Sequence, residues 1–445
     1  MNQNERPRFA TRFGVIATTV GSAVGLGNIW RFPYEAGANG GGAFLLLYII
    51  FVAAIGVPVV CAEFIMGRSS RLNIFGAFRS LAPRSGKAWV VVGCLGILSS
   101  ILILSFYSVV AGWTLEYLYE SLAGKIDNMG GVSRQTAFDT FTAGWGCVGW
   151  TLVVLAINAF VLLGGVRKGI ERASNILMPI LFAILIILCV NSLLLPNAAE
   201  GLHFLFAPDF SAIDSGVVIS ALGQAFFSLS LGVGTMMIYG SYFDERTPIV
   251  RSAATTAGLD TLVAIMAGIL IFPAVFSFGG SPAAGPKLVF EVLPDIFAMM
   301  PGGSIWASAF FLLLALASIT STISMSEICV AFLCEQWGMK RPVAVAVNAV
   351  VAMALGSVCA LSFGPLAGMK IFGMNTFDLF DYITSNIFMP LSGMLIAIFT
   401  GWVLKRSIIN HELAPAPRAL INIIVFCLRF VAPAAIALIF INGLL

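Results

Sequence analysis

The sequence predicts an all-α polytopic membrane protein with eleven transmembrane helices. The chain has 445 residues, of which 59% are hydrophobic and only 10% are charged, and its mean hydropathy is +0.98. Apolar stretches long enough to cross a bilayer recur along it, which a water-soluble protein of this length does not show. Glycine-rich runs interrupt two of these stretches, so we expect the first and the sixth helix to be broken within the membrane.

Hydropathy and turn-forming residues divide the chain into eleven apolar segments. The connections at 123–144 and 279–303 are polar or proline-containing, which predicts structured loops on one side of the membrane. Several segments exceed the roughly 20 residues that a perpendicular crossing needs, and this predicts tilt. We expect helices over residues 12–38, 41–69, 88–121, 145–164, 169–193, 216–243, 247–278, 304–337, 341–362, 375–404 and 418–443.

The basic residues predict the orientation. If the N-terminus lies in the cytoplasm, only four of the 24 Lys and Arg residues fall in outside loops, namely Lys125, Arg134, Lys287 and Lys370. This is the positive-inside pattern of membrane proteins. We therefore expect a multi-pass protein of the cell inner (plasma) membrane with a cytoplasmic N-terminus. An odd number of crossings places the C-terminus outside.

The first apolar segment contains Gly21, Gly25 and Gly27 within seven residues. Glycine weakens a helix, and irregular backbone at membrane depth is tolerated only where it is buried in protein or lines a cavity. A second glycine-containing polar run follows at 227–234, within the sixth segment. Paired broken helices indicate inverted repeats around a midplane binding site. We therefore expect a five-plus-five inverted-repeat transporter fold over 1–445, with repeats at 12–193 and 216–404 and an additional helix at 418–443.

Composition argues against several classes of function. The formal net charge is only +3, so nucleic acid is not an expected partner. The eight cysteines form no CxxC pair, which argues against a disulfide framework or a zinc site. The only histidines, His203 and His411, fall in predicted loops, so we expect no histidine-based enzyme. The expected partners are the lipid bilayer and a small solute, and no obligatory protein partner is inferred.

Six short motifs identify a resemblance. They lie at residues 21–33 (GSAVGLGNIWRFP), 39–44 (NGGGAF), 63–68 (EFIMGR), 168–172 (KGIER), 223–232 (GQAFFSLSLG) and 318–322 (SITST). Together they resemble the neurotransmitter:sodium symporter family, in its bacterial amino-acid transporter branch, which includes the leucine transporter. The resemblance covers essentially the whole chain. It implies a symporter that imports an amino acid with sodium by alternating access.

The resemblance implies two Na⁺ sites. Neutral oxygens of the kind these residues offer suit sodium. The alternative is that the hydroxyls only bond the backbone within a helix bundle. The first site would use the Ala23 carbonyl, Asn28, Ser228 and Asp260 with the substrate carboxylate, and the second would use Gly21, Val24, Ala317, Thr320 and Ser321.

Asp260 departs from the pattern of the leucine transporter, which has Asn at the matching position. A fixed carboxylate at a sodium site would balance the charge that chloride balances in animal members of the family, so chloride is not expected. Acids within a membrane are costly and usually functional. The alternative is that Asp260 lies near the cytoplasmic end of its helix and is solvated.

The resemblance places the substrate carboxylate against Gly25, Gly27 and the Tyr107 hydroxyl. The substrate ammonium would bind the carbonyls of Ala23, Phe227 and Ser228. Val233 stands where the leucine transporter has Phe, and Met325 is adaptable, so the resemblance predicts a large aliphatic or aromatic amino acid. Ordinary packing remains the alternative for Ile103 and Met325. The expected side-chain pocket consists of Val24, Ile103, Phe227, Ser230, Val233, Ser321, Ser324 and Met325.

Charged residues suggest two gates. Exposed ion pairs contribute only about 0–1 kcal/mol, which lets a gate open in every cycle. Plain surface charge is the alternative for both gates. Glu63, deep in the second helix, is expected to accept from amides freed by the breaks. The outer gate would pair Arg31 with Asp381, or with the competing Asp378, beside Gln224, Tyr107 and Phe227, and the inner gate would pair Arg6 with Glu335 near Ser241 and Tyr242.

Three other functions stay open. A symporter of the same fold could carry a betaine or a polyamine-like cation, although an apolar pocket disfavours a pure cation. Discontinuous helices also line the filters of channels, which saturable sodium-dependent uptake would exclude. An intramembrane enzyme would need a nucleophile beside a base, and no serine here lies beside a candidate base.

Overall fold

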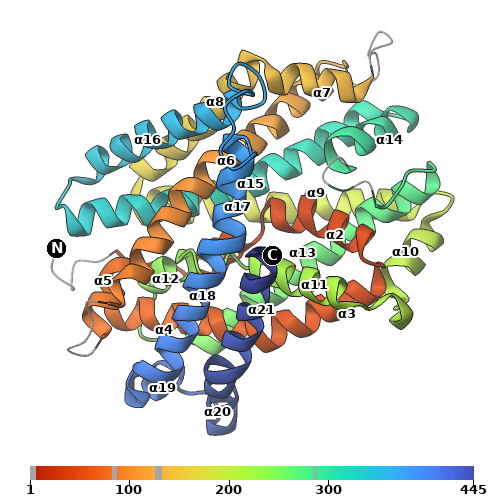
Figure 1. The fold of residues 1–445 in the computed structure, drawn as a ribbon. Coiled ribbons are helices and arrows are strands. Elements are labelled where there is room, and N and C mark those ends of the chain that lie inside the picture. The colour runs from red at the N-terminus through yellow and green to blue at the C-terminus, as the bar shows by residue number, and fades with distance from the viewer. Residues whose placement is uncertain (1–6, 83–87, 126–132, 284, 286–287, 445) are drawn as a thin grey trace.

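A computed structural model describes residues 7–82, 88–125, 133–283, 285 and 288–444. The described segments form a bundle of helices, and the expected all-α polytopic fold is confirmed (Figure 1). The first half contains α1 (Arg12–Ala23), η2 (Gly27–Arg31), α2 (Phe32–Ala38), α3 (Gly42–Phe51), η3 (Val52–Gly56), α4 (Val57–Ser70), α5 (Ile74–Leu81), α6 (Val90–Leu122), α7 (Arg134–Ala143), α8 (Trp145–Leu163), η4 (Val166–Glu171), α9 (Arg172–Leu193) and α10 (Ala198–Phe206).

In the second half, α18 (Met389–Ile398) packs against the last helix, α21 (Ala432–Leu444). This half contains η5 (Phe210–Ala212), α11 (Ser215–Ser228), α12 (Thr235–Gly240), α13 (Ile249–Ser277), η6 (Leu288–Val292), α14 (Leu293–Met299), α15 (Gly303–Gln336), α16 (Arg341–Leu361), α17 (Thr376–Tyr382), η7 (Ile383–Phe388), α18 (Met389–Ile398), η8 (Phe399–Val403), α19 (Arg406–Leu413), α20 (Arg418–Phe426), η9 (Cys427–Val431) and α21 (Ala432–Leu444).

The membrane-spanning segments are consistent with the expected eleven but do not fix that number. Within the described ranges, nine helical segments are long and apolar enough to cross a bilayer. The first span is a bent pair, in which Arg12–Ala23 and Gly27–Ala38 meet at 51°. The sixth is divided between α11 and α12, and each part is too short to cross alone. Both expected breaks are therefore present.

Polar side chains fix where several helices begin. Thr11 caps α1 because its hydroxyl accepts a hydrogen bond from the Gly14 amide at 2.8 Å. Asp214 caps α11 by accepting from the Val217 amide at 2.9 Å. Such caps satisfy amides that have no partner within the helix. They set the register of the two helices that later break.

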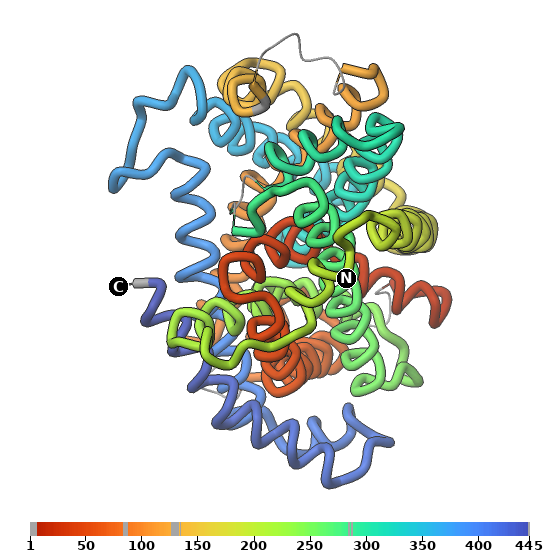
Figure 2. Tube along the Cα trace, turned by 90° about the vertical axis from the view of Figure 1, so that its right-hand side faces the viewer, coloured from red at the N-terminus to blue at the C-terminus, as the bar shows by residue number. Residues whose placement is uncertain are grey.

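The broken helices lie inside the bundle. α1 packs against α9, α13 and α15, and α12 packs against α4. α6 and α15, the two longest helices, pack against each other. The C-terminal segments α17 to α21 run along one side of the molecule (Figure 2). This arrangement surrounds both breaks with protein, as irregular backbone in a membrane requires.

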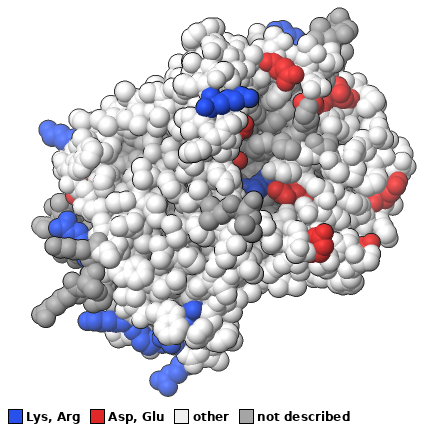
Figure 3. All heavy atoms as spheres, viewed as in Figure 1, with Lys and Arg blue, Asp and Glu red and all other residues white. Residues whose placement is uncertain are grey.

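The charged side chains divide between two ends of the molecule. In the view of Figure 3, Lys and Arg gather mainly toward the lower left, where α19 and α20 project, while Asp and Glu lie toward the right. We call the first of these the basic end. The expected outside loops lie elsewhere and are partly helical, with α7 in one and η6 and α14 in the other.

Candidate functional site

The first break lies between α1 and η2. Val24 leaves the helix with ψ of 117°, and the next amide, of Gly25, bonds the Asn28 side-chain oxygen at 3.0 Å. A Cβ on Gly25 would lie only 2.5 Å from the Tyr107 hydroxyl and 2.6 Å from Ser321 Oγ. Only glycine therefore fits where α6 and α15 approach the break.

The second break lies between α11 and α12. Gly232 and Gly234 have φ of 84° and 92°, a region that glycine reaches without strain. The Gly232 amide donates to Glu63 at 2.9 Å, and the Met237 amide donates to the same carboxylate at 3.2 Å. Glu63 is fully buried. The expectation that Glu63 accepts from amides freed by the break is confirmed.

Asp260 lies between the two breaks rather than near a solvated helix end. It is fully buried in α13. The Ser228 hydroxyl donates to its Oδ2 at 2.6 Å, and the Asn28 amide donates to its Oδ1 at 2.8 Å. Tyr48 adds a hydroxyl that donates to Ser228 Oγ at 3.2 Å. The structure thus brings together three side chains predicted for the first sodium site, together with Tyr48, which sequence reasoning missed.

The residues predicted for the second sodium site also meet. The Ser321 hydroxyl donates to the Val24 carbonyl at 3.2 Å, which joins α15 to the end of α1. A Cβ on Gly21 would lie 3.6 Å from Thr320. The Thr320 hydroxyl itself donates to the Ala317 carbonyl at 3.0 Å. These contacts place backbone carbonyls and hydroxyls from two helices side by side.

A small cavity of about 20 Å³ lies between the breaks. This is room for about one water molecule, so an amino acid requires its walls to separate. Every lining residue except Met389 was predicted for the substrate, and sequence reasoning missed Met389 because a methionine in an apolar segment has no signature of a binding role. The cavity is lined by Ala23, Gly25, Gly27, Ile103, Tyr107, Phe227, Ser228, Ser230, Val233, Ser321, Met325 and Met389.

Two predicted substrate residues lie outside this lining. Val24 is fully buried and contributes its carbonyl to Ser321. The Ser324 hydroxyl accepts from Tyr239 at 2.8 Å. The Tyr107 hydroxyl accepts from the Leu26 amide at 2.7 Å. The Leu26 amide was not predicted from the sequence, because a backbone group has no residue signature.

The outer gate differs from expectation. Arg31 Nε lies 3.5 Å from Glu35, one turn along the same helix, and among the described residues no ion pair joins Arg31 to Asp381. The Asp381 carboxylate instead accepts from the Ser385 hydroxyl at 2.9 Å. The physical reason is proximity, because residues four apart share a helix face, whereas Asp381 belongs to a different helix, α17.

That second cavity, of about 220 Å³, lies outside Phe227. Arg31 and Glu35 line one wall, and Ser385 lies on another. Phe227 lines both cavities, and the Arg31 guanidinium lies 4.5 Å from the centre of its ring. Gln224 fixes this region by donating to the Gly27 carbonyl at 2.7 Å. Phe227 therefore separates the small inner cavity from the larger outer one.

The expected inner gate is only partly described. Arg6 lies outside the described residues. Glu335 accepts from the backbone amide of Asn73 at 2.8 Å and from its side chain at 2.7 Å. The Ser241 hydroxyl donates to the Ile238 carbonyl. The neighbouring Tyr242 hydroxyl donates to Glu327 at 2.6 Å.

Glu327, which had no expected role, forms a buried ion pair. Its Oε2 lies 2.6 Å from Nη2 of Arg341, and Oε1 accepts from Nη1 at 3.1 Å. The Glu327 side chain is fully buried and the Arg341 side chain is 26% exposed. This bidentate ion pair joins α15 to the first residue of α16. Such a pair costs most when one partner is removed.

Comparison with known proteins assigns the chain to a family. A model of the sodium:neurotransmitter symporter family matches residues 6–129 and 135–445. The chain belongs to this family. The symporter is 38% identical to an uncharacterised sodium-dependent transporter of Bacillus subtilis (strain 168), over 99% of this chain and 98% of that one. It is 31% identical to another from Methanocaldococcus jannaschii, over 91% of this chain and 83% of that one.

A solved structure shares the fold of the symporter. The crystal structure of MhsT in complex with L-phenylalanine matches with a TM-score of 0.91 and 44% identity, over 98% of this chain and 100% of that one. The family and these relatives make this chain a multi-pass, sodium-dependent transporter and not an enzyme.

The Asp260 cluster of the symporter fits a monovalent cation. A buried carboxylate is costly unless a positive charge compensates it, and within the described part of the chain no Lys or Arg pairs with Asp260. The hydroxyls of Ser228 and Tyr48 contact it, whereas Asn28 contacts it through the side-chain amide nitrogen. No group of three or more His, Cys, Asp or Glu able to hold a metal occurs among the described residues. The carboxylate of Asp260 and the neighbouring hydroxyl oxygens suit a hard cation such as Na⁺ rather than a transition metal.

Proposed function

We propose that this symporter imports a large hydrophobic amino acid, aliphatic or aromatic, together with Na⁺. The observation that carries the proposal is the inner cavity, whose Ile103, Val233 and Met325 walls are apolar while its other side is formed by the two breaks. The related MhsT was crystallised with L-phenylalanine, which supports the same substrate class here.

In the proposed binding mode the substrate carboxylate lies near Tyr107 and the amides of the first break. Half-helix ends and exposed amides favour an anion there. The substrate ammonium faces the carbonyls of Ala23, Phe227 and Ser228. Phe227 then closes over the substrate from the outer cavity, and Arg31 moves from Glu35 toward Asp381 as the outer side closes.

We propose two Na⁺ ions, one at Asp260, Asn28 and Ser228 and one at Thr320 and Ser321. Moving one charge through about 100 mV contributes about 2.3 kcal/mol, and a tenfold gradient about 1.4 kcal/mol per ion. Two ions therefore supply about 7 kcal/mol, enough for roughly 10⁵-fold accumulation. The fixed charge of Asp260 makes chloride unnecessary.

The proposed orientation puts the basic end in the cytoplasm of a cell inner membrane. The Lys and Arg residues that Figure 3 shows gather mainly there, as the positive-inside rule predicts. The N-terminus is then cytoplasmic and the C-terminus outside. The outer cavity beside Arg31 becomes the entrance.

Uptake into proteoliposomes tests the proposal. The purified chain is reconstituted with an inward Na⁺ gradient, and uptake of each of the twenty amino acids is measured, with K⁺ replacing Na⁺ as the control. We expect saturable uptake of phenylalanine, leucine or a similar residue that stops without Na⁺. Absence of uptake for all twenty would remove the amino-acid assignment. Uptake of glycine betaine alone would favour the alternative zwitterion.

A further inference from the structure

A third cavity, of about 270 Å³, lies at the basic end, apart from the two cavities of the transport pathway. It is formed by the start of α1, the start of α13 and the residues just before α13. Its lining contains two arginines and no acid. The lining residues are Arg12, Val15, Ile16, Thr247, Pro248, Arg251, Ser252 and Thr255.

The two arginines are available to bind an anion. Arg12 is the first residue of α1 and Arg251 the third residue of α13, and both are exposed. No hydrogen bond or ion pair of either side chain is found within the described ranges. The planar guanidinium group binds phosphate oxygens in pairs, which makes arginine the preferred residue for such contacts.

Two nearby acids, Glu171 and Asp244, already accept hydrogen bonds from other groups. Glu171 accepts from the amides of Ala10 and Thr11, at 2.9 and 3.1 Å. Asp244 accepts from the Thr247 hydroxyl at 2.5 Å. Neither carboxylate lines the cavity. The local charge at the cavity is therefore positive.

The rest of the lining changes from polar to apolar along the cavity, as a phospholipid does from its headgroup to its acyl chains. Ser252 and Thr255 lie one turn apart on α13, and their hydroxyls have no hydrogen-bond partner among the described residues. Val15 and Ile16 lie about one turn deeper along α1 and present apolar surface. The arginines match the phosphate of a phospholipid, and the hydroxyls beside them match its ester groups. The apolar side chains match the start of an acyl chain.

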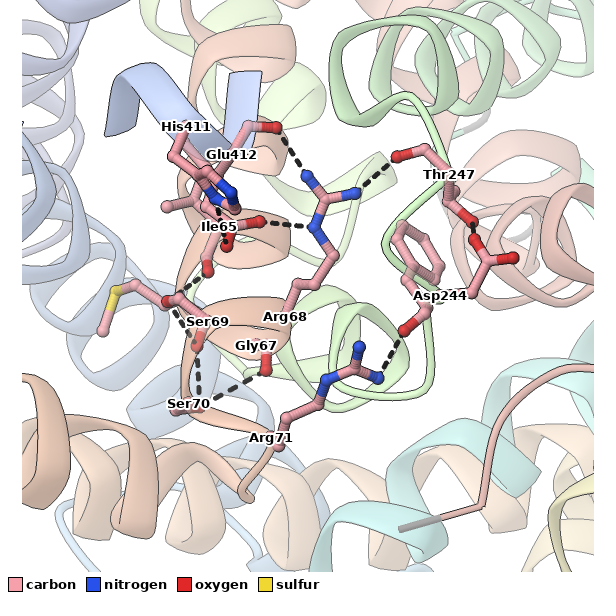
Figure 4. Close-up of polar contacts among 12 residues, drawn as sticks. Ile65, Gly67, Arg68, Ser69, Ser70, Arg71, Asp244, Thr247, His411 and Glu412 are labelled. Atoms are coloured by element: carbon pink, nitrogen blue, oxygen red, sulfur yellow. Dashed lines mark hydrogen bonds and ion pairs between the residues drawn. The ribbon is translucent and has the colours of Figure 1, made fainter. Parts of the chain in front are cut away.

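The α13 wall of the cavity is anchored by a network of hydrogen bonds and one ion pair, shown in Figure 4. Buried Arg68 of α4 donates to the Thr247 carbonyl just before α13 and to the Glu412 carbonyl of α19. Arg68 also forms an ion pair with the Glu412 carboxylate. Arg71 donates to the Phe243 carbonyl. The α13 wall is thus tied to two other helices.

The opposite wall is α1, the basic-end half of the first broken helix. We propose that this cavity binds the phosphate of an anionic phospholipid, which bridges Arg12 on α1 to Arg251 on α13. A bound lipid holds α1 against the anchored start of α13. Because α1 also carries Gly21 and Ala23, the lipid stabilises the sodium-site end of α1. Only the choice of the cytoplasmic leaflet rests on the proposed orientation.

Lipid binding to the purified full chain in detergent tests the proposal without any transport measurement. Phosphatidylglycerol or phosphatidylcholine with identical acyl chains is titrated, and bound lipid is counted by native mass spectrometry beside the thermal unfolding midpoint. We expect saturable binding of phosphatidylglycerol that phosphatidylcholine does not match. Inorganic phosphate alone, in a separate arm, should not raise the midpoint.

Matched variants locate the site. Arg12→Gln and Arg251→Gln should each weaken phosphatidylglycerol binding about fivefold, and the pair at least about tenfold. Arg418→Gln, which removes the same charge from an exposed position outside the cavity, should bind like the wild type. If the Gln pair unfolds, the double Arg→Lys variant keeps the charges but loses the paired contacts, and should bind more weakly than the wild type.

Three results would overturn the proposal. One is wild-type affinity for phosphatidylglycerol in a folded double variant. Another is equal binding of the two lipids. The last is full stabilisation by inorganic phosphate, which would make the cavity an anion site and not a lipid site. None of these depends on whether an amino acid is transported.

Discussion

The Ser228 hydroxyl donates to Oδ2 of Asp260 over 2.6 Å, and this bond joins the end of α11 to the middle of α13. Both residues are buried, and Asn28 of the first broken helix donates to the same carboxylate. Two breaks and one intact helix therefore meet at a single negative charge. In the proposed binding mode, a sodium ion at Asp260 contacts all three elements and orders the site.

Replacing Asp260 by Asn should weaken sodium binding. The substitution keeps the shape of the side chain but removes the charge that balances Na⁺, so we expect the sodium concentration for half-maximal uptake to rise about tenfold or more. We also expect uptake to become sensitive to chloride. Asp139→Asn, at an exposed position of α7, is the control. Uptake by the Asp260→Asn protein that is wild-type-like and indifferent to chloride would remove Asp260 from the sodium site.

Gly25→Ala should impair substrate binding. Its Cβ would lie 2.5 Å from the Tyr107 hydroxyl and 2.6 Å from Ser321 Oγ, so both side chains must move from the break. We expect amino-acid uptake to fall at least about tenfold. In Gly258→Ala the new Cβ meets nothing within 4 Å, and this variant should transport normally. It should also gain up to about 1 kcal/mol in helix stability. Equal uptake by the two variants would contradict the prediction.

Val233→Phe should change substrate preference. Val233 is fully buried and lines the inner cavity, so a larger ring reduces the space for the substrate side chain. We expect phenylalanine to lose affinity relative to leucine or alanine, measured by competition against a labelled substrate. Overpacking costs about 1–3 kcal/mol, so thermal unfolding is measured in parallel. Val350→Phe, on the exposed face of α16, is the control. An unchanged ranking of substrates would place Val233 outside the specificity pocket.

Arg341→Ala should destabilise the protein more than removal of both partners. Glu327 is fully buried, so without Arg341 its carboxylate has no compensating positive charge. We expect this to lower the free energy of unfolding by about 3 kcal/mol. The double variant Glu327→Gln with Arg341→Ala removes the buried charge and should recover much of that loss. Thermal unfolding of the wild type, both single variants and the double variant measures the coupling. Lys405→Ala, at an exposed basic residue, should change the midpoint little. Additive effects would show that the pair is not coupled.

The broken helices could be predicted because their signals are local. Gly21, Gly25 and Gly27 weaken a helix within two turns, and this penalty is read from adjacent residues. The same holds for helix ends, where Asp214 caps α11 by contacting an amide three residues away. The apolar length of each span is likewise a property of one segment. The residues of the central site were carried over from family motifs, and the structure places most of them around one cavity.

The contacts that sequence reasoning missed lie between segments far apart in the chain or in the backbone. Met389 enters the inner cavity from α18, and the Leu26 amide bonds the Tyr107 hydroxyl. The outer gate shows the competition directly, because Arg31 has Glu35 one turn away on the same helix and Asp381 on a separate helix, α17. Which acid binds depends on how far the helices stand apart.

The sequence by itself determined the spans, the two breaks and the charge bias between the ends, because helix length, glycine and charge act over a few residues. The tertiary structure decided which distant side chains share a site. It paired Glu327 with Arg341 and placed Arg12 and Arg251 around one cavity. The physical reason is that such contacts depend on how the helices pack against one another, which no single stretch of residues specifies.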